Sequence, residues 1–208
     1  GIWRCYNYIE GCRTYDVVEN TRQAYQAAKA FGAFQDLVSY LPIEKVEVTI
    51  PGFHDTPRRF ARLIAAMKSD ACDRVKDVQK EIDFITSRES IVGVLLDHLA
   101  AGRLIERVTH NDTKLNNVMI DEQTDEAVCV IDLDTVMPGL ALYDFGDLIR
   151  GATSPVAEDE PDTSKVEMRL PMFEAIVEGY LETAASFLTP LEIDLLPFSA
   201  KLISLETG

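Results

Sequence analysis

Residues 109–117 read Thr-His-Asn-Asp-Thr-Lys-Leu-Asn-Asn. The stretch contains the spacing H-x-D-x-K-x-x-N, in which four polar side chains fall at fixed intervals on one tight loop. These positions are filled by His110, Asp112, Lys114 and Asn117. Taken singly, each has an ordinary structural reading, as a loop cap, a turn residue or a hydrogen-bonded core histidine. Their joint occurrence is informative only in the structural context that the pattern requires.

That context follows directly in the sequence. Short apolar runs occupy residues 118–120 and 127–131, and a polar stretch separates them. This arrangement predicts a β-hairpin with a polar turn. The hairpin ends at Asp132, fifteen residues past Asn117. We therefore expect Asp132 to return to the polar loop.

Phosphoryl transfer requires the residue types found here. The reaction needs a carboxylate to orient the attacking hydroxyl group, and ligands to hold Mg²⁺ on the phosphates. Asp112 is the candidate for the first role. Asn117 and Asp132 offer the hard oxygen ligands that Mg²⁺ prefers. We predict a magnesium site formed by these two residues beside the catalytic carboxylate.

Two neighbouring patterns do not supply this chemistry. Residues 144–146 read Asp-Phe-Gly, but they lie too far beyond Asn117 for a single hairpin, and Asp132 already stands at the hairpin end. Apolar neighbours indicate that Asp144 is buried, where it would brace the loop by accepting backbone N–H bonds; a solvated acid is the alternative. Gly146 and Gly151 imitate a phosphate-binding loop, but Ala-Thr follows where that motif needs Lys-Ser or Lys-Thr.

The remainder of the chain is predicted to be mostly helical. Apolar residues recur at three- and four-residue steps in several segments, as on one face of a helix. Thr56 and Pro57 predict a helix start, with Thr56 as its cap. The aromatic opening, residues 1–9, predicts a β-strand. The helical segments are expected near residues 18–31, 60–67, 75–85, 90–99 and 173–181, and after Pro190. From the strand-like opening and the apolar pattern that runs to the last residues, we expect the sequence to be a fragment of a longer protein.

Composition restricts the partners. The formal net charge is −15, which works against nucleic-acid binding because that binding depends on neutralising phosphates. No apolar run reaches the ~18 residues that a membrane helix needs. The four cysteines show no zinc-like spacing, and reduced thiols are favoured over a disulfide framework. We expect a cytoplasmic protein that binds neither nucleic acid nor membrane; its oligomeric state is left open.

The motifs carry a family resemblance. Residues 108–119, 130–139 and 143–147 resemble the aminoglycoside-phosphotransferase-like small-molecule kinases, and within that group bacterial N-acetylhexosamine 1-kinases. The resemblance implies an α+β, protein-kinase-like fold. Residues 1–11 would be the last small-lobe strand and the hinge, and residues 12–208 the helical large lobe with its catalytic-loop hairpin. Most of the small lobe would be missing.

The resemblance also implies an activity, namely ATP-dependent phosphorylation of the anomeric 1-hydroxyl of GlcNAc or GalNAc. Asp112 would be the catalytic base, Asn117 and Asp132 would bind Mg²⁺, and Lys114 would lie near the transferred phosphate. Backbone groups of the hinge would contact adenine; these belong to Tyr8, Ile9 and Glu10. The family's phosphate-covering loop and phosphate-pairing lysine are not found in the sequence. We therefore expect this chain alone to be inactive.

Several roles stay open at this point. His54 and Asp55 are candidates for substrate contact, although Asp55 is as well explained as a helix-entry residue. Arg150 can pair with Asp144 or Asp147, or reach a phosphate. His110 is expected to support the loop. Alternative functions are a kinase of choline, an amino alcohol or an aminoglycoside, or a non-catalytic large lobe.

Overall fold

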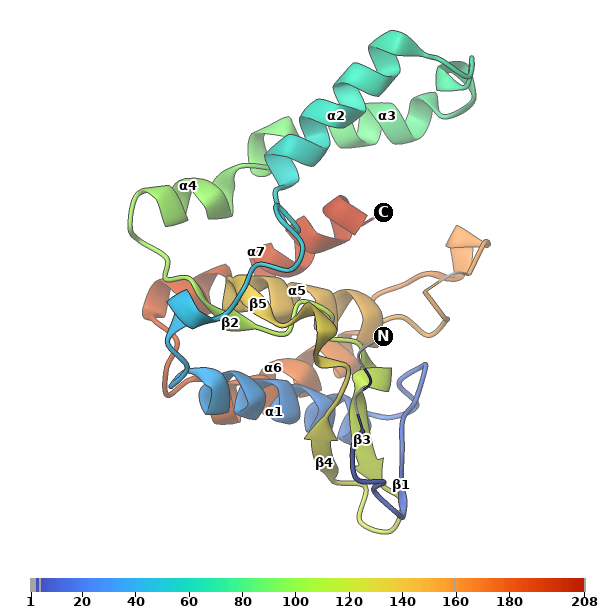
Figure 1. The fold of residues 1–208 in the computed structure, drawn as a ribbon. Helices are drawn as coiled ribbons and strands as arrows, with labels where there is room; N and C mark the ends of the chain where they lie inside the picture. The colour runs from blue at the N-terminus through green and yellow to red at the C-terminus, as the bar shows by residue number, and fades with distance from the viewer. Residues whose placement is uncertain (1–2, 4, 159, 208) are drawn as a thin grey trace.

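A computed structural model describes residue 3 and residues 5–158 and 160–207. Helices dominate, and the strands are short (Figure 1). The α-helices are α1 (Thr21–Val38), α2 (Thr56–Ser69), α3 (Gln79–Thr86), α4 (Val94–Ala100), α5 (Ala141–Ala152), α6 (Leu170–Ala184) and α7 (Pro190–Thr207). The strands are β1 (Cys12–Arg13), β2 (Arg107–Thr109), β3 (Val118–Asp121), β4 (Ala127–Val130) and β5 (Met137–Gly139).

The strands form two small antiparallel sheets. One has the order β1-β3-β4, and its β3-β4 hairpin confirms the hairpin expected after the polar loop. The other pairs β2 with β5, so that Thr109 lies opposite Met137. The chain therefore enters the polar loop from β2, passes through the hairpin, and returns beside its starting point.

The helical body packs around α5. Figure 1 shows α1 beside α6, and α5 beside α7, with both pairs on the same side of the hairpin sheet. Almost all of α5 is buried, including the carboxylates Asp144 and Asp147. Residues 141–152 were not predicted to be helical because two glycines, Gly146 and Gly151, lower the helix propensity of the segment. The other helical segments of the prediction are confirmed, with boundaries shifted by several residues.

An arm made of α2 and α3 projects from this body (Figure 1). Its base is fastened to the C-terminal end of α7 by the buried carboxylate of Glu206. That carboxylate accepts a hydrogen bond from Thr56 Oγ1, and it pairs with His54 Nδ1 at 2.9 Å and Arg59 Nε at 3.5 Å. The expected cap is corrected here: Thr56 is the first helical residue, and Asp55 caps α2 by accepting from Arg58 N–H at 3.0 Å.

The predicted strand at residues 1–9 is wrong for the residues described. Trp3 and residues 5–9 form no strand, and the first strand is instead β1 at Cys12–Arg13. Aromatic and β-branched side chains favour a strand only when a neighbouring strand pairs with it, and β1 has such a partner in β3. Gly1, Ile2 and Arg4 lie outside the described residues. The division of the chain at residue 11 stays a prediction.

Two expectations about the chain as a whole can be compared with the structure. All four cysteines are free thiols, as predicted. None of the helices in the described part of the chain combines the length and the apolar character that a membrane crossing needs.

We predict that Gly146→Ala destabilises the protein by about 1–3 kcal/mol, because overpacking a tight contact forces backbone shifts. A Cβ at Gly146 would lie 2.6 Å from the Ser199 carbonyl oxygen of α7 and 2.7 Å from Ile203 Cγ1. Urea unfolding of the variant and the parent measures the difference.

Gly151→Ala is the matched control in the same helix, because nothing lies within 4 Å of its added Cβ. It should be neutral, or stabilising by up to about 1 kcal/mol through helix propensity. Equal stability of the two variants would show that α5 and α7 are not in tight contact at Gly146.

Candidate active site

The loop at residues 110–117 is fixed at both of its ends. It leaves β2 directly and closes with a 3₁₀ turn at Leu115–Asn117, from which β3 continues. Thr135 Oγ1 donates to the His110 carbonyl oxygen at 2.7 Å, which ties the loop to the segment that returns after the hairpin. The loop therefore has little freedom to change shape.

Asp112 lies at the centre of the polar groups. Asn117 Nδ2 donates to Asp112 Oδ2 at 3.1 Å and to the Asp112 carbonyl oxygen at 2.9 Å. Lys114 Nζ lies 3.2 Å from Asp112 Oδ1, and the Asp112 side chain is 27% exposed. Each carboxylate oxygen thus has one donor, and the group keeps an open side for a hydroxyl.

The hairpin brings Asp132 back toward Asn117, as predicted. The N–H of Ile131 donates to the Asn117 carbonyl oxygen at 2.9 Å, and Asp132 is the next residue. Its side chain is exposed, and its backbone is left-handed, with φ 60°. Asn117 and Asp132, from the two ends of the hairpin, therefore lie close together.

The donor set fits a magnesium ion that also binds a nucleotide. Because Asn117 Nδ2 is turned toward Asp112, the amide oxygen faces away from it, and the Asp132 carboxylate is exposed. Mg²⁺ is usually held by one or two protein oxygens together with phosphates and water. Among the described residues, no group of three or more His, Cys, Asp or Glu side chains could hold a metal without such help.

His110 is a buried supporting residue. Its Nε2 lies 2.9 Å from the Ile131 carbonyl oxygen, which can only accept, so Nε2 carries the proton. Its Nδ1 then accepts from Asp112 N–H at 3.3 Å. The rings of Phe31 and Phe34 approach the imidazole edge-on, with ring centroids 5.4 and 5.5 Å away. His110 thus joins the loop to the hairpin end.

Two carboxylates of α5 hold the loop backbone. Asp144 accepts from His110 N–H at 2.9 Å and from Asn111 N–H at 2.7 Å, so the expected hydrogen bonds are present. It also accepts from Gln35 Nε2 at 2.6 Å. Burial raises the pKa of Asp144, and the two backbone N–H donors oppose that rise. Only 1% of Asp144 is exposed, so its carboxylate is not accessible to a metal ion that also binds a nucleotide.

Asp147 also holds the loop, a role that was not predicted from the sequence, where Asp147 was considered only as a partner of Arg150. Its Oδ2 accepts from Thr113 N–H at 2.9 Å. The signal for it was the three-residue spacing from Asp144, which places both carboxylates on one helix face.

Asn111 has strained backbone geometry next to Asp112. Its φ of 64° lies in the left-handed region. The side chain stabilises this conformation, because Nδ2 donates to the carbonyl oxygens of Thr109 and Thr135 at 3.2 and 3.0 Å. Left-handed residues on both sides of the site, Asn111 and Asp132, match the tendency of backbone strain to gather at functional sites.

Arg150 pairs with Asp147, not with Asp144. Its Nη2 lies 2.8 Å from Asp147 Oδ1, and its Nη1 lies 2.8 Å from Glu158 Oε1. Lys114 also reaches Glu158, at 3.5 Å. Partial burial alone would lower the pKa of Lys114, but Asp112 and Glu158 outweigh it and hold the pKa above its usual value. Glu158 was not predicted to lie near the site.

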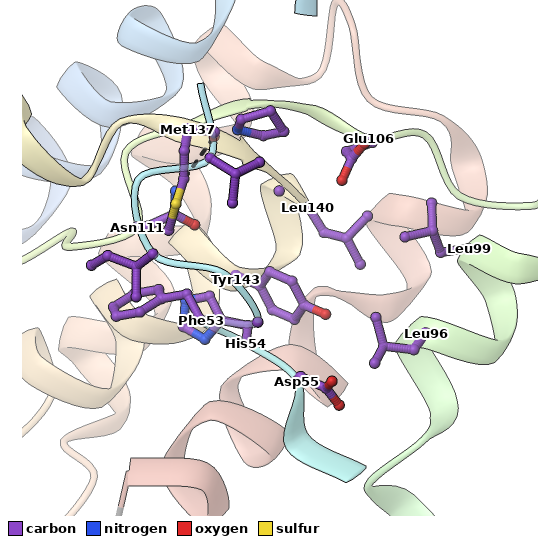
Figure 2. Close-up of a pocket in the computed structure, with 15 residues that line it drawn as sticks. Phe53, His54, Asp55, Leu96, Leu99, Glu106, Asn111, Met137, Leu140 and Tyr143 are labelled. Atoms are coloured by element: carbon purple, nitrogen blue, oxygen red, sulfur yellow. Dashed lines mark hydrogen bonds between the residues drawn. The ribbon is translucent and has the colours of Figure 1, made fainter. Parts of the chain in front are cut away.

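A separate pocket contains His54 and Asp55 (Figure 2). Its volume is about 260 Å³, and Asn111 lines it, next to Asp112 in the chain. The His54 ring stacks on Tyr143 with centroids 4.5 Å apart. Its Nδ1 is engaged by Glu206, and its Nε2 is buried with no hydrogen-bond partner in the described structure. The ring of His54 therefore forms part of the pocket wall, and its two nitrogen atoms do not face the cavity.

The remaining pocket residues come from distant elements. Figure 2 shows Tyr143 between the His54 side and Leu96 and Leu99 of α4, with Asp55 and Glu106 on either side of it. Burial raises the pKa of Tyr143, so its hydroxyl remains protonated. No sequence pattern linked these residues, since they are brought together only by the tertiary fold.

Tyr8, Ile9 and Glu10 lie in an irregular segment that leads into β1. Tyr8 is 87% exposed. Just after them, the Gly11 carbonyl oxygen accepts from Glu122 N–H at 2.9 Å, which joins the segment to the hairpin. Their contact with adenine stays a prediction.

Comparison with known proteins supplies a family and a fold. The family model described as "Phosphotransferase enzyme family" (APH) matches residues 2–175. A microcompartment-associated aminopropanol kinase is 18% identical with a TM-score of 0.58, over 96% of this chain and 57% of that one. An aminoglycoside-3'-phosphotransferase of type VIII is 16% identical with a TM-score of 0.41, over 93% of this chain and 65% of that one. The expected α+β kinase-like fold, mainly the helical large lobe, is thus confirmed.

We predict that Asp144→Ala destabilises the protein by about 2–5 kcal/mol, since it leaves two buried backbone N–H groups without acceptors, each costing about 1–3 kcal/mol. Thermal and urea unfolding provide the measurement. Asp97→Ala, an exposed aspartate of α4, is the control and should change stability by less than about 0.5 kcal/mol. Equal effects of the two substitutions would remove Asp144 from its bracing role.

Proposed function

Since this chain belongs to the phosphotransferase enzyme family, we propose that the whole protein transfers the γ-phosphoryl group of ATP to a hydroxyl group of a small molecule. The chain spans 57% of the aminopropanol kinase and 65% of the aminoglycoside phosphotransferase that it resembles. The activity is therefore proposed for the protein that contains this chain.

One observation carries the proposal. The Asp112 carboxylate lies between Asn117 Nδ2 and Lys114 Nζ, on a loop whose backbone is held by Asp144. Such a carboxylate is suited to orient an acceptor hydroxyl and to take its proton as the phosphoryl group transfers. Lys114 is suited to contact the transferred group. Because the loop is held in place before substrate arrives, little reorganisation is needed during the reaction.

Mg²⁺ and ATP complete the proposed site. Asn117 and Asp132 would hold the ion, which neutralises charge on the nucleotide phosphates when it is bound. Tyr8, Ile9 and Glu10 would meet the adenine through backbone groups, on the resemblance stated above. Asp144 takes no part in metal binding in this proposal, because its carboxylate is buried and holds the backbone of the loop.

For the acceptor we propose an N-acetylhexosamine, phosphorylated at its anomeric 1-hydroxyl. The resemblance of residues 108–150 to N-acetylhexosamine 1-kinases supports this choice. The pocket beside Asn111 agrees with it, because aromatic faces of Phe53 and Tyr143 and the carboxylates of Asp55 and Glu106 could meet the two faces and the hydroxyls of a sugar. At about 260 Å³ it is below the usual 300–1,000 Å³ of ligand pockets, which favours a single ring over a multi-ring aminoglycoside.

An amino alcohol is the second candidate. Asp55 and Glu106 line the pocket, and no lysine or arginine is among its described lining residues. Such a pocket favours an ammonium group through its charge. The similar solved structure with a TM-score of 0.58 is an aminopropanol kinase, which agrees with this candidate but shares only 18% identity.

We predict that Asp112→Asn lowers kcat in the whole protein by about 10²–10⁴-fold, as expected for a positioned acid–base group, and leaves the KM for Mg-ATP within about twofold. The assay follows ADP release with GlcNAc, GalNAc and 1-amino-2-propanol, each offered separately. Sugar 1-phosphate formation supports the first acceptor, and phosphorylation of the amino alcohol alone supports the second.

Asp125→Asn is the matched control, because Asp125 is an exposed hairpin residue with φ 56°, a conformation that asparagine tolerates. Its kcat should equal that of the parent. Unchanged turnover in Asp112→Asn would exclude Asp112 as the base. Nucleotide binding without turnover on any acceptor would favour the non-catalytic alternative.

We predict that Asp132→Asn removes most of the Mg²⁺ dependence of ATP binding, because it deletes the charged ligand and keeps the left-handed backbone at that residue. Calorimetric titration with and without Mg²⁺ gives the ratio of affinities. Asp144→Ala, compared at a temperature at which it is folded, should keep the parent's ratio. If Asp144→Ala instead loses the Mg²⁺ dependence, then Asp144, and not Asp132, is the metal ligand.

A further inference from the structure

Two cations of the candidate site share one carboxylate. Glu158 Oε1 lies 2.8 Å from Arg150 Nη1, and Glu158 Oε2 lies 3.5 Å from Lys114 Nζ. Arg150 comes from α5 and Lys114 from the catalytic loop, whereas Glu158 belongs to the connection between α5 and α6. One side chain therefore joins this connection to two elements of the site.

The connection, residues 153–169, is closed at its neck. Arg169 N–H donates to the Thr153 carbonyl oxygen at 3.1 Å, and Arg169 Nη2 donates to the Ser154 carbonyl oxygen at 2.9 Å. Residues 155–158 and 160–168 contain only a short 3₁₀ turn as regular structure, and this part of the chain extends away from the body in Figure 1. The ion pairs of Lys165 with Glu160 and Asp162 stay inside the segment. Glu158 thus fastens a loop that is otherwise fixed at its neck.

The two cations face open space. Lys114, Arg150 and Glu158 line a cavity of about 550 Å³ together with Asp16 and Asn116. The Glu158 side chain is 49% exposed, compared with 16% for Arg150. The carboxylate is thus the member of the group that can leave into solvent, while Arg150 remains held by Asp147.

Charge balance decides what else could bind there. Lys114 and Arg150 supply two positive charges, and Asp112, Asp147 and Glu158 supply three negative charges. A phosphoryl group carries about −1.5 to −2 at neutral pH, with three acceptor oxygens. It would be repelled while Glu158 stays in place. With Glu158 displaced, it would meet the same two donors through charge-assisted hydrogen bonds, which Arg can form in bidentate geometry.

We propose that Lys114 and Arg150 form a cradle for a phosphoryl group, which Glu158 occupies when that group is absent, so that residues 153–169 act as a latch released by phosphate. This rests on the proposed function only for the source of the phosphoryl group, either the nucleotide or the phosphorylated product. The cradle itself is a property of this chain's own residues.

The test is a titration of the 208-residue chain with inorganic phosphate, followed by NMR. Glu158→Gln keeps the size of the side chain and removes the competing charge, so phosphate should bind about three- to tenfold more tightly, the range expected when two partly exposed ion pairs are lost. Signals of Lys114 and Arg150 should move on titration. Adding Arg150→Gln to this variant should abolish the gain.

Glu160→Gln is the matched control, because it removes the same charge from the same segment but its partner is Lys165. Its phosphate affinity should stay within about twofold of the parent. An equal gain in both variants would overturn the proposal in favour of general charge repulsion. Phosphate that binds Glu158→Gln no more tightly than the parent, or without moving the Lys114 and Arg150 signals, would also overturn it.

Hydrogen exchange gives a readout that does not depend on a variant. Saturating phosphate should speed amide exchange in residues 155–168 of the parent chain, since the latch is then open. Unchanged exchange under saturation contradicts the latch.

The two sources are separated with the whole protein. If the nucleotide supplies the phosphoryl group, Glu158→Gln tightens Mg-ATP but not Mg-ADP; if the product supplies it, neither nucleotide changes while inorganic phosphate still binds more tightly. Failure of the kinase assay with tighter phosphate binding would refute the proposed function and keep the cradle. Turnover in the kinase assay, together with unchanged phosphate binding in Glu158→Gln, would support the proposed function and refute the cradle.

Discussion

Two carboxylates on one face of a buried helix hold the backbone of the loop that carries Asp112. Asp144 and Asp147 receive N–H donors from His110, Asn111 and Thr113. A buried carboxylate is costly unless it is hydrogen-bonded, and buried N–H groups are costly without acceptors, so each side satisfies the other. Because α5 packs against the other helices, its two carboxylates fix the loop at one position relative to the hydrophobic core. Tyr180 and Gln35 extend this link into α6 and α1.

The sequence was informative where chemistry depends on local spacing. The loop, the hairpin and the return to Asp132 all lie within a short stretch of chain, so residue spacing alone set their arrangement. The burial of Asp144 was also foreseeable, because apolar neighbours surround it in the sequence. These features account for the part of the candidate site that was predicted.

The remaining parts depend on contacts between distant segments. Helix α5 was not predicted because Gly146 and Gly151 lower its helix propensity, and the contact of Asp147 with the loop was missed with it. Glu158 and Glu206 are ordinary acids in the sequence, and only the fold gives them Lys114 and His54 as partners. The strand predicted at residues 1–9 was wrong for a related reason. Its aromatic residues have strand propensity, but a strand also needs a neighbouring strand to pair with.

The candidate site has two parts that can change in evolution to different extents: the pocket beside the arm of α2 and α3, and the loop held by α5. The base of the arm contributes His54 and Asp55 to the pocket wall and is hydrogen-bonded to Glu206 of α7. The residues proposed for phosphoryl transfer lie instead on the loop that α5 holds. Since the entropy of closing a longer connection grows slowly with its length, insertions and deletions in the arm cost little. Under the proposed function, lineages could therefore change the arm, and with it the choice of acceptor, while keeping the residues proposed for phosphoryl transfer.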